Sequence, residues 1–109
     1  MAVIISTEED LRKLSYEKPY LSVKYHNDYI PVCQELYKTY EQLSNDQKYS
    51  AITFVRINAD ENRIAQKLIE KDVYSFMSIY KKGLLIESRT ISNENDIEAL
   101  LDKLTSLVD

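Results

Sequence analysis

The only cysteine of the chain, Cys33, is the residue best suited to covalent chemistry. It lies in the stretch from Tyr25 to Leu36, which reads YHNDYIPVCQEL and has Pro31 two residues before the thiol. This pattern is typical of a turn from a strand into a helix, where free N–H groups can stabilise a thiolate. Exchange through a dithiol needs a second cysteine that resolves the mixed disulfide. A chain with one cysteine cannot form an internal disulfide.

Other kinds of catalytic or metal site find little support in the sequence. His26 is the only histidine, so the further Cys or His ligands that zinc would need are missing. The pair Asp60-Glu61 is interpreted as the start of a helix rather than as an acid–base pair. Gly83 is the only glycine, which excludes a glycine-rich phosphate loop. We therefore expect neither a metal nor a cofactor.

The composition is that of an ordinary globular protein, with 44% hydrophobic and 29% charged residues among 109. The 14 basic and 18 acidic residues give a net charge of −4, and the longest basic run is Lys81-Lys82. Nucleic-acid binding is therefore disfavoured. The apolar run Ala2 to Ile5 is too short for a signal-peptide core or a membrane span. We expect one domain over residues 1–109, located in the cytoplasm, where a single unpaired cysteine fits the reducing conditions.

Strands and helices alternate through the first half of the chain. Thr7 with Asp10 has the spacing of a helix cap, and Pro19 would end that helix. Proline suits the first position of the next helix, where its missing N–H has no helical partner. The expected elements are a strand over 2–6, a helix from Thr7 to Pro19, a strand over 20–25, a helix from Pro31 and a strand over 51–58.

The second half is predicted to end in a hairpin and a helix. Gly83 would supply the positive φ of the hairpin turn. The expected elements are a helix from Asp60, a strand over 73–80, a turn over 81–83, a strand over 84–91 and a helix capped by residues 92–95. The order β-α-β-α-β-α-β-β-α predicts an α/β fold with a central mixed sheet and helices on both faces.

This order and several short strings resemble the thioredoxin family over essentially the whole chain. Residues 23–33 align without a gap with the family's active-site segment, which ends in Trp-Cys-Gly-Pro-Cys. Tyr29 takes the place of the tryptophan, and Ile30 and Cys33 take the places of the two cysteines. The string FVRINADEN is similar to a family strand that ends in an Asp-x-Asp-Glu-Asn turn. The resemblance implies a thioredoxin-like fold.

The departures from the family pattern concern its redox chemistry. Ile30 replaces the attacking cysteine and cannot ionise, and Lys24 replaces the buried carboxylate that handles the proton of the second thiol. Met77 is placed at the family's cis-proline, where a trans peptide is expected because a non-proline cis bond costs ~3 kcal/mol. An alignment without gaps would put Ser75 there instead. The resemblance therefore implies a thioredoxin fold without thiol–disulfide oxidoreductase activity.

Two functions remain open from the sequence. The first is a non-catalytic protein-binding module, whose former active-site groove holds a partner protein or a second copy of the chain. Clustered apolar side chains often mark such a contact surface. The second is a single-thiol redox enzyme of the thioredoxin or glutaredoxin type acting through Cys33, although monothiol relatives keep the first cysteine of the motif. The predicted binding residues are Tyr29, Ile30, Tyr74, Phe76 and Met77.

Overall fold

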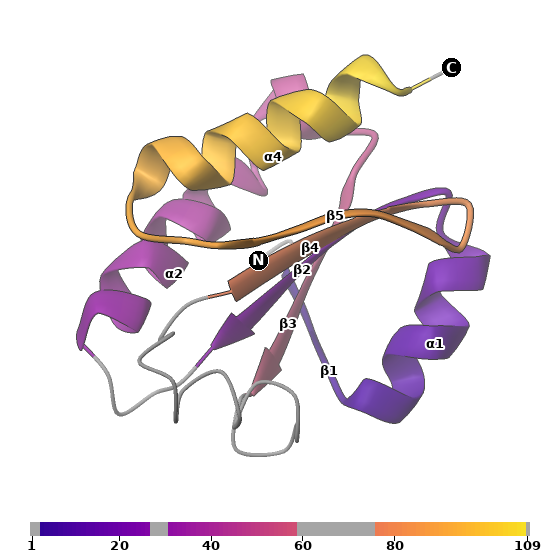
Figure 1. The fold of residues 1–109 in the computed structure, drawn as a ribbon, viewed down its shortest axis with the longest axis horizontal. Helices are drawn as coiled ribbons and strands as arrows, with labels where there is room; N and C mark the ends of the chain where they lie inside the picture. The colour runs from indigo at the N-terminus through magenta and orange to yellow at the C-terminus, as the bar shows by residue number, and fades with distance from the viewer. Residues whose placement is uncertain (1–2, 27–30, 59–75, 109) are drawn as a thin grey trace.

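The computed structural model describes residues 3–26, 31–58 and 76–108 (Figure 1). The side chains of residues 8, 26, 31–33 and 58 lie outside this description. The elements are β1 (Val3–Ser6), α1 (Glu8–Glu17), β2 (Tyr20–His26), α2 (Pro31–Leu43), the 3-10 helix η1 (Gln47–Tyr49), β3 (Thr53–Asn58), β4 (Phe76–Lys81), β5 (Leu84–Thr90) and α4 (Glu94–Ser106). The predicted helix from Asp60 and the first part of the predicted strand over 73–80 fall on residues outside the described ranges.

The five strands form one mixed sheet in the order β1-β3-β2-β4-β5. The strands β1, β3 and β2 are parallel, whereas β4 runs antiparallel to both β2 and β5. Parallel strands of one sheet require crossover connections; α1 lies between β1 and β2 in the chain, and α2 lies between β2 and its neighbour β3. The predicted mixed sheet is therefore confirmed.

Two helices begin at side-chain caps that local sequence patterns had indicated. The backbone N–H of Asp10 donates to Thr7 Oγ1 at 3.2 Å, which confirms the cap of α1. At α4 the cap falls within the predicted range 92–95, on Asn93, whose Oδ1 accepts from the N–H of Asp96 at 3.1 Å. Such bonds satisfy N–H groups that have no partner inside the helix.

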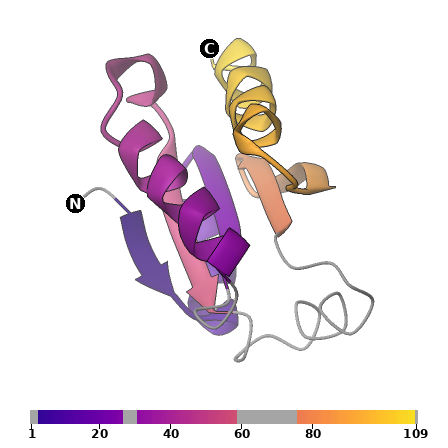
Figure 2. The same cartoon turned by 90° about the vertical axis from the view of Figure 1, so that its left-hand side faces the viewer.

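The sheet buries a separate apolar cluster on each face. The larger cluster lies between the sheet and the pair α2 and α4, which run side by side in Figure 2. The smaller cluster lies under α1, on the opposite face (Figure 1). Leu21 and Val23 of β2 both face α1, because side chains two residues apart in a strand share one face. Helices on both faces of the sheet are thus confirmed.

The β4–β5 hairpin differs from the prediction in two details. Both turn residues have positive φ, 51° at Lys82 and 85° at Gly83, as a two-residue type I′ turn requires, whereas the sequence had indicated only Gly83. Tyr80 pairs with Leu85 and Ile79 pairs with Glu87, so Ile86 is an extra residue in the ladder. This bulge places Leu85 on the α1 side and Glu87 on the α4 side.

Candidate functional site

The predicted site lies where β2 ends at His26 and α2 begins at Pro31. Proline at the first helical position is confirmed, and Cys33 is therefore the third residue of α2, in its first turn. The side chain of Cys33 lies outside the described part, so its accessibility stays a prediction. Three predicted binding residues also lie outside the described ranges, namely Tyr29, Ile30 and Tyr74.

The buried hydroxyl of Tyr40 fixes α2 to the sheet. It lies 2.7 Å from Ser22 Oγ and 3.0 Å from the carbonyl oxygens of Ser22 and Val55, and it accepts the N–H of Val55 at 3.2 Å. Burial raises the pKa of the Tyr40 hydroxyl well above its usual value, so this group stays protonated. Because Ser22 is on β2 and Val55 on β3, one hydroxyl holds the helix against both strands.

Lys24 is fully buried in the middle of the sheet. Its neighbours in the ladder are Arg56 on β3 and Met77 on β4. Side chains two residues apart in a strand share a face, so Lys24 points to the same side as Ser22, towards α2. Lysine is seldom fully buried, because an ammonium group loses its hydration there. The α2 face of β2 therefore holds a basic group close to the predicted site.

The predicted role of Met77 as an exposed anchor is wrong. Its side chain is fully buried and belongs to the larger apolar cluster. Its backbone lies between two strands, opposite Lys24 of β2 and Arg89 of β5. Met77 therefore lies inside the described sheet, with a strand on either side, rather than at its border. The alternative, Ser75, directly precedes β4 and lies outside the described ranges.

Phe76 is the one predicted binding residue that the structure both describes and leaves partly exposed. It begins β4 and pairs with Tyr25, near the end of β2. The two rings have centroids 5.2 Å apart and planes tilted by 44°. Such tilted aromatic pairs are favourable beyond the area that they bury. The carboxyl end of β2 thus carries a small aromatic cluster on the α1 face of the sheet.

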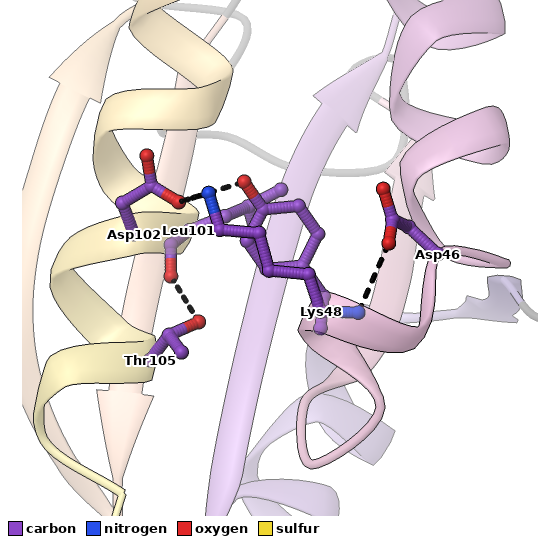
Figure 3. Close-up of polar contacts among 6 residues, drawn as sticks. Asp46, Lys48, Leu101, Asp102 and Thr105 are labelled. Atoms are coloured by element: carbon purple, nitrogen blue, oxygen red, sulfur yellow. Dashed lines mark hydrogen bonds and ion pairs between the residues drawn. The ribbon is translucent and has the colours of Figure 1, made fainter.

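A polar cluster that the sequence did not indicate joins η1 to α4 (Figure 3). Asp102 Oδ1 lies 2.8 Å from Lys48 Nζ and accepts a hydrogen bond of 2.7 Å from the Tyr49 hydroxyl. The Lys48 ammonium lowers the pKa of the Asp102 carboxyl, and burial raises the pKa of the Tyr49 hydroxyl. Each group is therefore held in its ordinary protonation state. This arrangement favours a structural link over proton transfer.

Within residues 3–26, 31–58 and 76–108, no helix is long and apolar enough to cross a membrane. Nor do the side chains described there include three His, Cys, Asp or Glu residues grouped so that they could hold a metal ion.

Comparison with known proteins identifies the family. The family model described as Thioredoxin matches residues 2–106. The chain belongs to the thioredoxin family. No curated protein sequence matches it. In the thioredoxin family alignment, the residues at the end of β2 and the start of α2 correspond to the active-site segment.

Solved thioredoxins share the fold of this family member at low sequence identity. A thioredoxin from Malassezia sympodialis is 14% identical with a TM-score of 0.78, and the match covers 96% of this chain and 91% of that one. Mitochondrial thioredoxin 3 from Saccharomyces cerevisiae is 20% identical with a TM-score of 0.77, covering 93% and 94%. Oxidised thioredoxin from Plasmodium falciparum is 16% identical with a TM-score of 0.76, covering 94% and 98%. At these identities the likeness concerns the fold alone.

Proposed function

We propose that this thioredoxin-family chain is a non-catalytic module that binds a protein segment in the groove at the carboxyl end of β2. The observation that carries the proposal is the single cysteine among 109 residues. A dithiol cycle needs one thiolate to attack and a second thiol to release the product. Ile30, at the place of the attacking cysteine in the family pattern, can do neither.

The burial of Lys24 supports the same proposal. In the family pattern its place belongs to a carboxylate, whereas Lys24 carries an amine, a group of very different ordinary pKa. Lys24 is fully buried on the α2 face of the sheet, so it is part of the interior rather than a surface substitution. A chain adapted to dithiol exchange would have little use for this change.

The binding surface that we propose consists of Tyr29, Ile30, Tyr74 and Phe76, without the buried Met77. Of these four residues, the structure describes Phe76. The centroid of its ring lies 5.2 Å from that of Tyr25, at the end of the sheet. Large aromatic side chains are frequent at the centres of protein interfaces. An extended partner segment would place apolar side chains against this aromatic cluster.

The second candidate is a single-thiol enzyme that acts through Cys33. One observation favours it, because Cys33 is in the first turn of α2, where N–H groups without helical partners can stabilise a thiolate. Reaction of the native chain with DTNB distinguishes the two functions. Slow labelling that becomes fast in denaturant supports the binding module, and fast labelling in the native state supports the enzyme.

Replacement Ile30→Cys tests the missing nucleophile. We expect no insulin reduction by the wild-type chain and measurable turnover by Ile30→Cys. In this variant the cysteine introduced at position 30 can form a mixed disulfide with insulin, and Cys33 can then displace the reduced insulin thiol. The matched control, Ile30→Cys/Cys33→Ser, should again be inactive. Turnover by the wild-type chain would contradict the proposal.

Binding is tested by affinity capture followed by identification of the bound proteins. Proteins held by the wild-type chain should be lost from the variant Tyr29→Ala/Phe76→Ala. They should be retained by Glu98→Ala, a control at an exposed residue of α4 outside both proposed binding surfaces. Equal capture by all three chains would show that the groove is not the binding surface.

A further inference from the structure

A second exposed apolar surface lies at the opposite end of the sheet from the groove. Three large hydrophobic side chains lie at this end of the sheet, Tyr16 and Leu85 on the α1 side and Leu84 on the other side, with exposed fractions of 72% for Tyr16, 70% for Leu84 and 56% for Leu85. We call these three residues, together with Lys18 and Lys82, the tip surface. Single exposed hydrophobic residues are ordinary, but a group of them marks an interaction site more often.

Two contacts bring the end of α1 against the hairpin turn that precedes Leu84 and Leu85, although these segments are far apart in the sequence. A methyl group on Gly83 would lie 3.1 Å from two ring carbons of Tyr16, so the ring lies directly over the hairpin turn. The N–H of Lys82 donates to the carbonyl oxygen of Pro19 at 2.8 Å. The end of α1 and the β4–β5 turn are therefore held together, as Figure 1 shows.

The tip surface is separate from the groove. Tyr20, the first residue of β2, pairs with Lys81 beside the turn, whereas Tyr25 pairs with Phe76 near the groove. A strand of this length spans about 20 Å. A ligand at one end would therefore leave the other end free.

The tip surface has the opposite charge to the chain as a whole. Residues 12–18 and 81–85 contain five basic residues and one acidic residue, in a chain with a net charge of −4. A concentrated positive charge around apolar side chains favours a partner that is both acidic and apolar. It disfavours a symmetric contact between two copies, which would bring Lys18 and Lys82 close to their own copies.

We propose that the tip surface binds an extended acidic and apolar segment of a second protein. The strand β5 begins at Leu84 and is an edge strand among the strands that the structure describes, and the outer backbone groups of an edge strand can hydrogen-bond to an added strand. An anionic lipid surface would use the same charge and apolar side chains but not the strand edge. The edge therefore favours a protein segment.

A random 12-residue peptide library displayed on phage tests the proposal. It is selected on the wild-type chain and counter-selected on Tyr16→Ser/Leu84→Ser/Leu85→Ser, whose folding is checked by circular dichroism. We expect enriched peptides with net negative charge and several Leu, Ile or Phe residues. For a synthetic peptide of the enriched sequence, Lys18→Glu/Lys82→Glu should weaken binding at least about tenfold, as loss of central interface residues commonly does.

NMR chemical-shift mapping with the same synthetic peptide locates the contact. The shifts are expected within residues 13–20 and 80–87, and the groove variant Ile30→Ala should bind the peptide as the wild type does. Selection of basic or uncharged peptides, enrichment that the triple variant does not remove, or shifts confined to the groove would overturn the proposal. Binding to phosphatidylserine vesicles, which the triple variant loses, without any enriched peptide would also overturn it in favour of a lipid surface.

Discussion

The hydroxyl of Tyr40, a residue of α2, forms hydrogen bonds with the backbone of two strands. It lies within 3.2 Å of four polar atoms, all of them on Ser22 or Val55. A single O–H can donate only one hydrogen, so the other contacts use its oxygen as acceptor or share the donor. Polar groups buried in this way are costly to leave without a partner. The position of α2, and of Cys33 within it, depends on this one group.

Substitution Tyr40→Phe keeps the ring and removes the hydroxyl. We expect the free energy of unfolding to fall by about 1–3 kcal/mol, because Ser22 and Val55 lose a buried partner. Urea denaturation measures the change. The control Tyr16→Phe removes an exposed hydroxyl and should change stability by less than about 0.5 kcal/mol. Equal losses in the two variants would contradict this account of α2.

At the scale of the elements, side-chain links join η1, before β3, and the edge strand β5 to the last helix, α4. Tyr49 of η1 donates to Asp102 of α4, which is 53 positions further along the chain. Lys103 of α4 is 2.6 Å from Glu87 of β5. Each link joins an element near the sheet to α4, so this helix is held from two sides.

The acid dependence of stability should change in the variant Asp102→Asn. Lys48 lowers the pKa of the Asp102 carboxyl in the folded chain. The ion pair therefore stabilises the fold above the unfolded pKa of about 3.9, and that contribution is lost as the pH falls through the folded pKa. Both side chains are largely exposed, so the contribution is at most about 1 kcal/mol.

Urea midpoints at pH 6 and pH 2.5 measure this difference. The variant should be less stable than the wild type at pH 6, and the gap should narrow at pH 2.5. Replacement Glu98→Gln, on the same helix, serves as the control and should show no such narrowing. A gap of the same size at both pH values would exclude the ion pair as its cause.

At the scale of the whole molecule, the strand order separates a well-paired interior from two open edges. The strands β3, β2 and β4 each have a strand on both sides, whereas β1 and β5 each have one described neighbour. Val23 and Ile79 are fully buried in the central strands, while Ile5 of β1 is 60% exposed. The interior and the edges should therefore differ in their local opening.

Native-state hydrogen exchange tests this difference. Amides of Val23 and Ile79 should exchange at least about tenfold more slowly than those of β1. Both residues lie in strands that have a neighbour on each side, so their amides become exposed only when the sheet itself opens. The comparison is made at one pH, after correction for intrinsic exchange rates. Equal protection of β1 and β2 would show that the sheet opens as a single unit.

Local patterns in the sequence predicted most of the fold. The cap at Thr7, the proline at the start of α2 and the cap of α4 within residues 92–95 each reflect chemistry within a few residues. Local patterns could not place Met77, because only the pairing register of β4 with β2 and β5 shows that it lies between Lys24 and Arg89.

The remaining features depend on contacts between distant parts of the chain. The link from Tyr49 to Asp102 and the meeting of Tyr16 with the hairpin turn leave no local pattern, so the sequence did not indicate either. The predicted roles of Tyr29, Ile30 and Tyr74 stay predictions, and their test is the capture experiment.

The bulge at Ile86 bears on how this strand can change in length. In the observed ladder Leu85 lies opposite Tyr80 and Glu87 lies opposite Ile79, with Ile86 as the extra residue between them. In a regular ladder the residues opposite Tyr80 and Ile79 would follow each other directly in the sequence. Loss of Ile86 would therefore keep Leu85 beside α1 and Glu87 beside Lys103. Loss of Ser88 would instead move the residues that follow it to the other face. Ile86 and Glu87 lie on the same side of the sheet, so a single-codon deletion of either one would remove the bulge while every other side chain of the strand keeps its side.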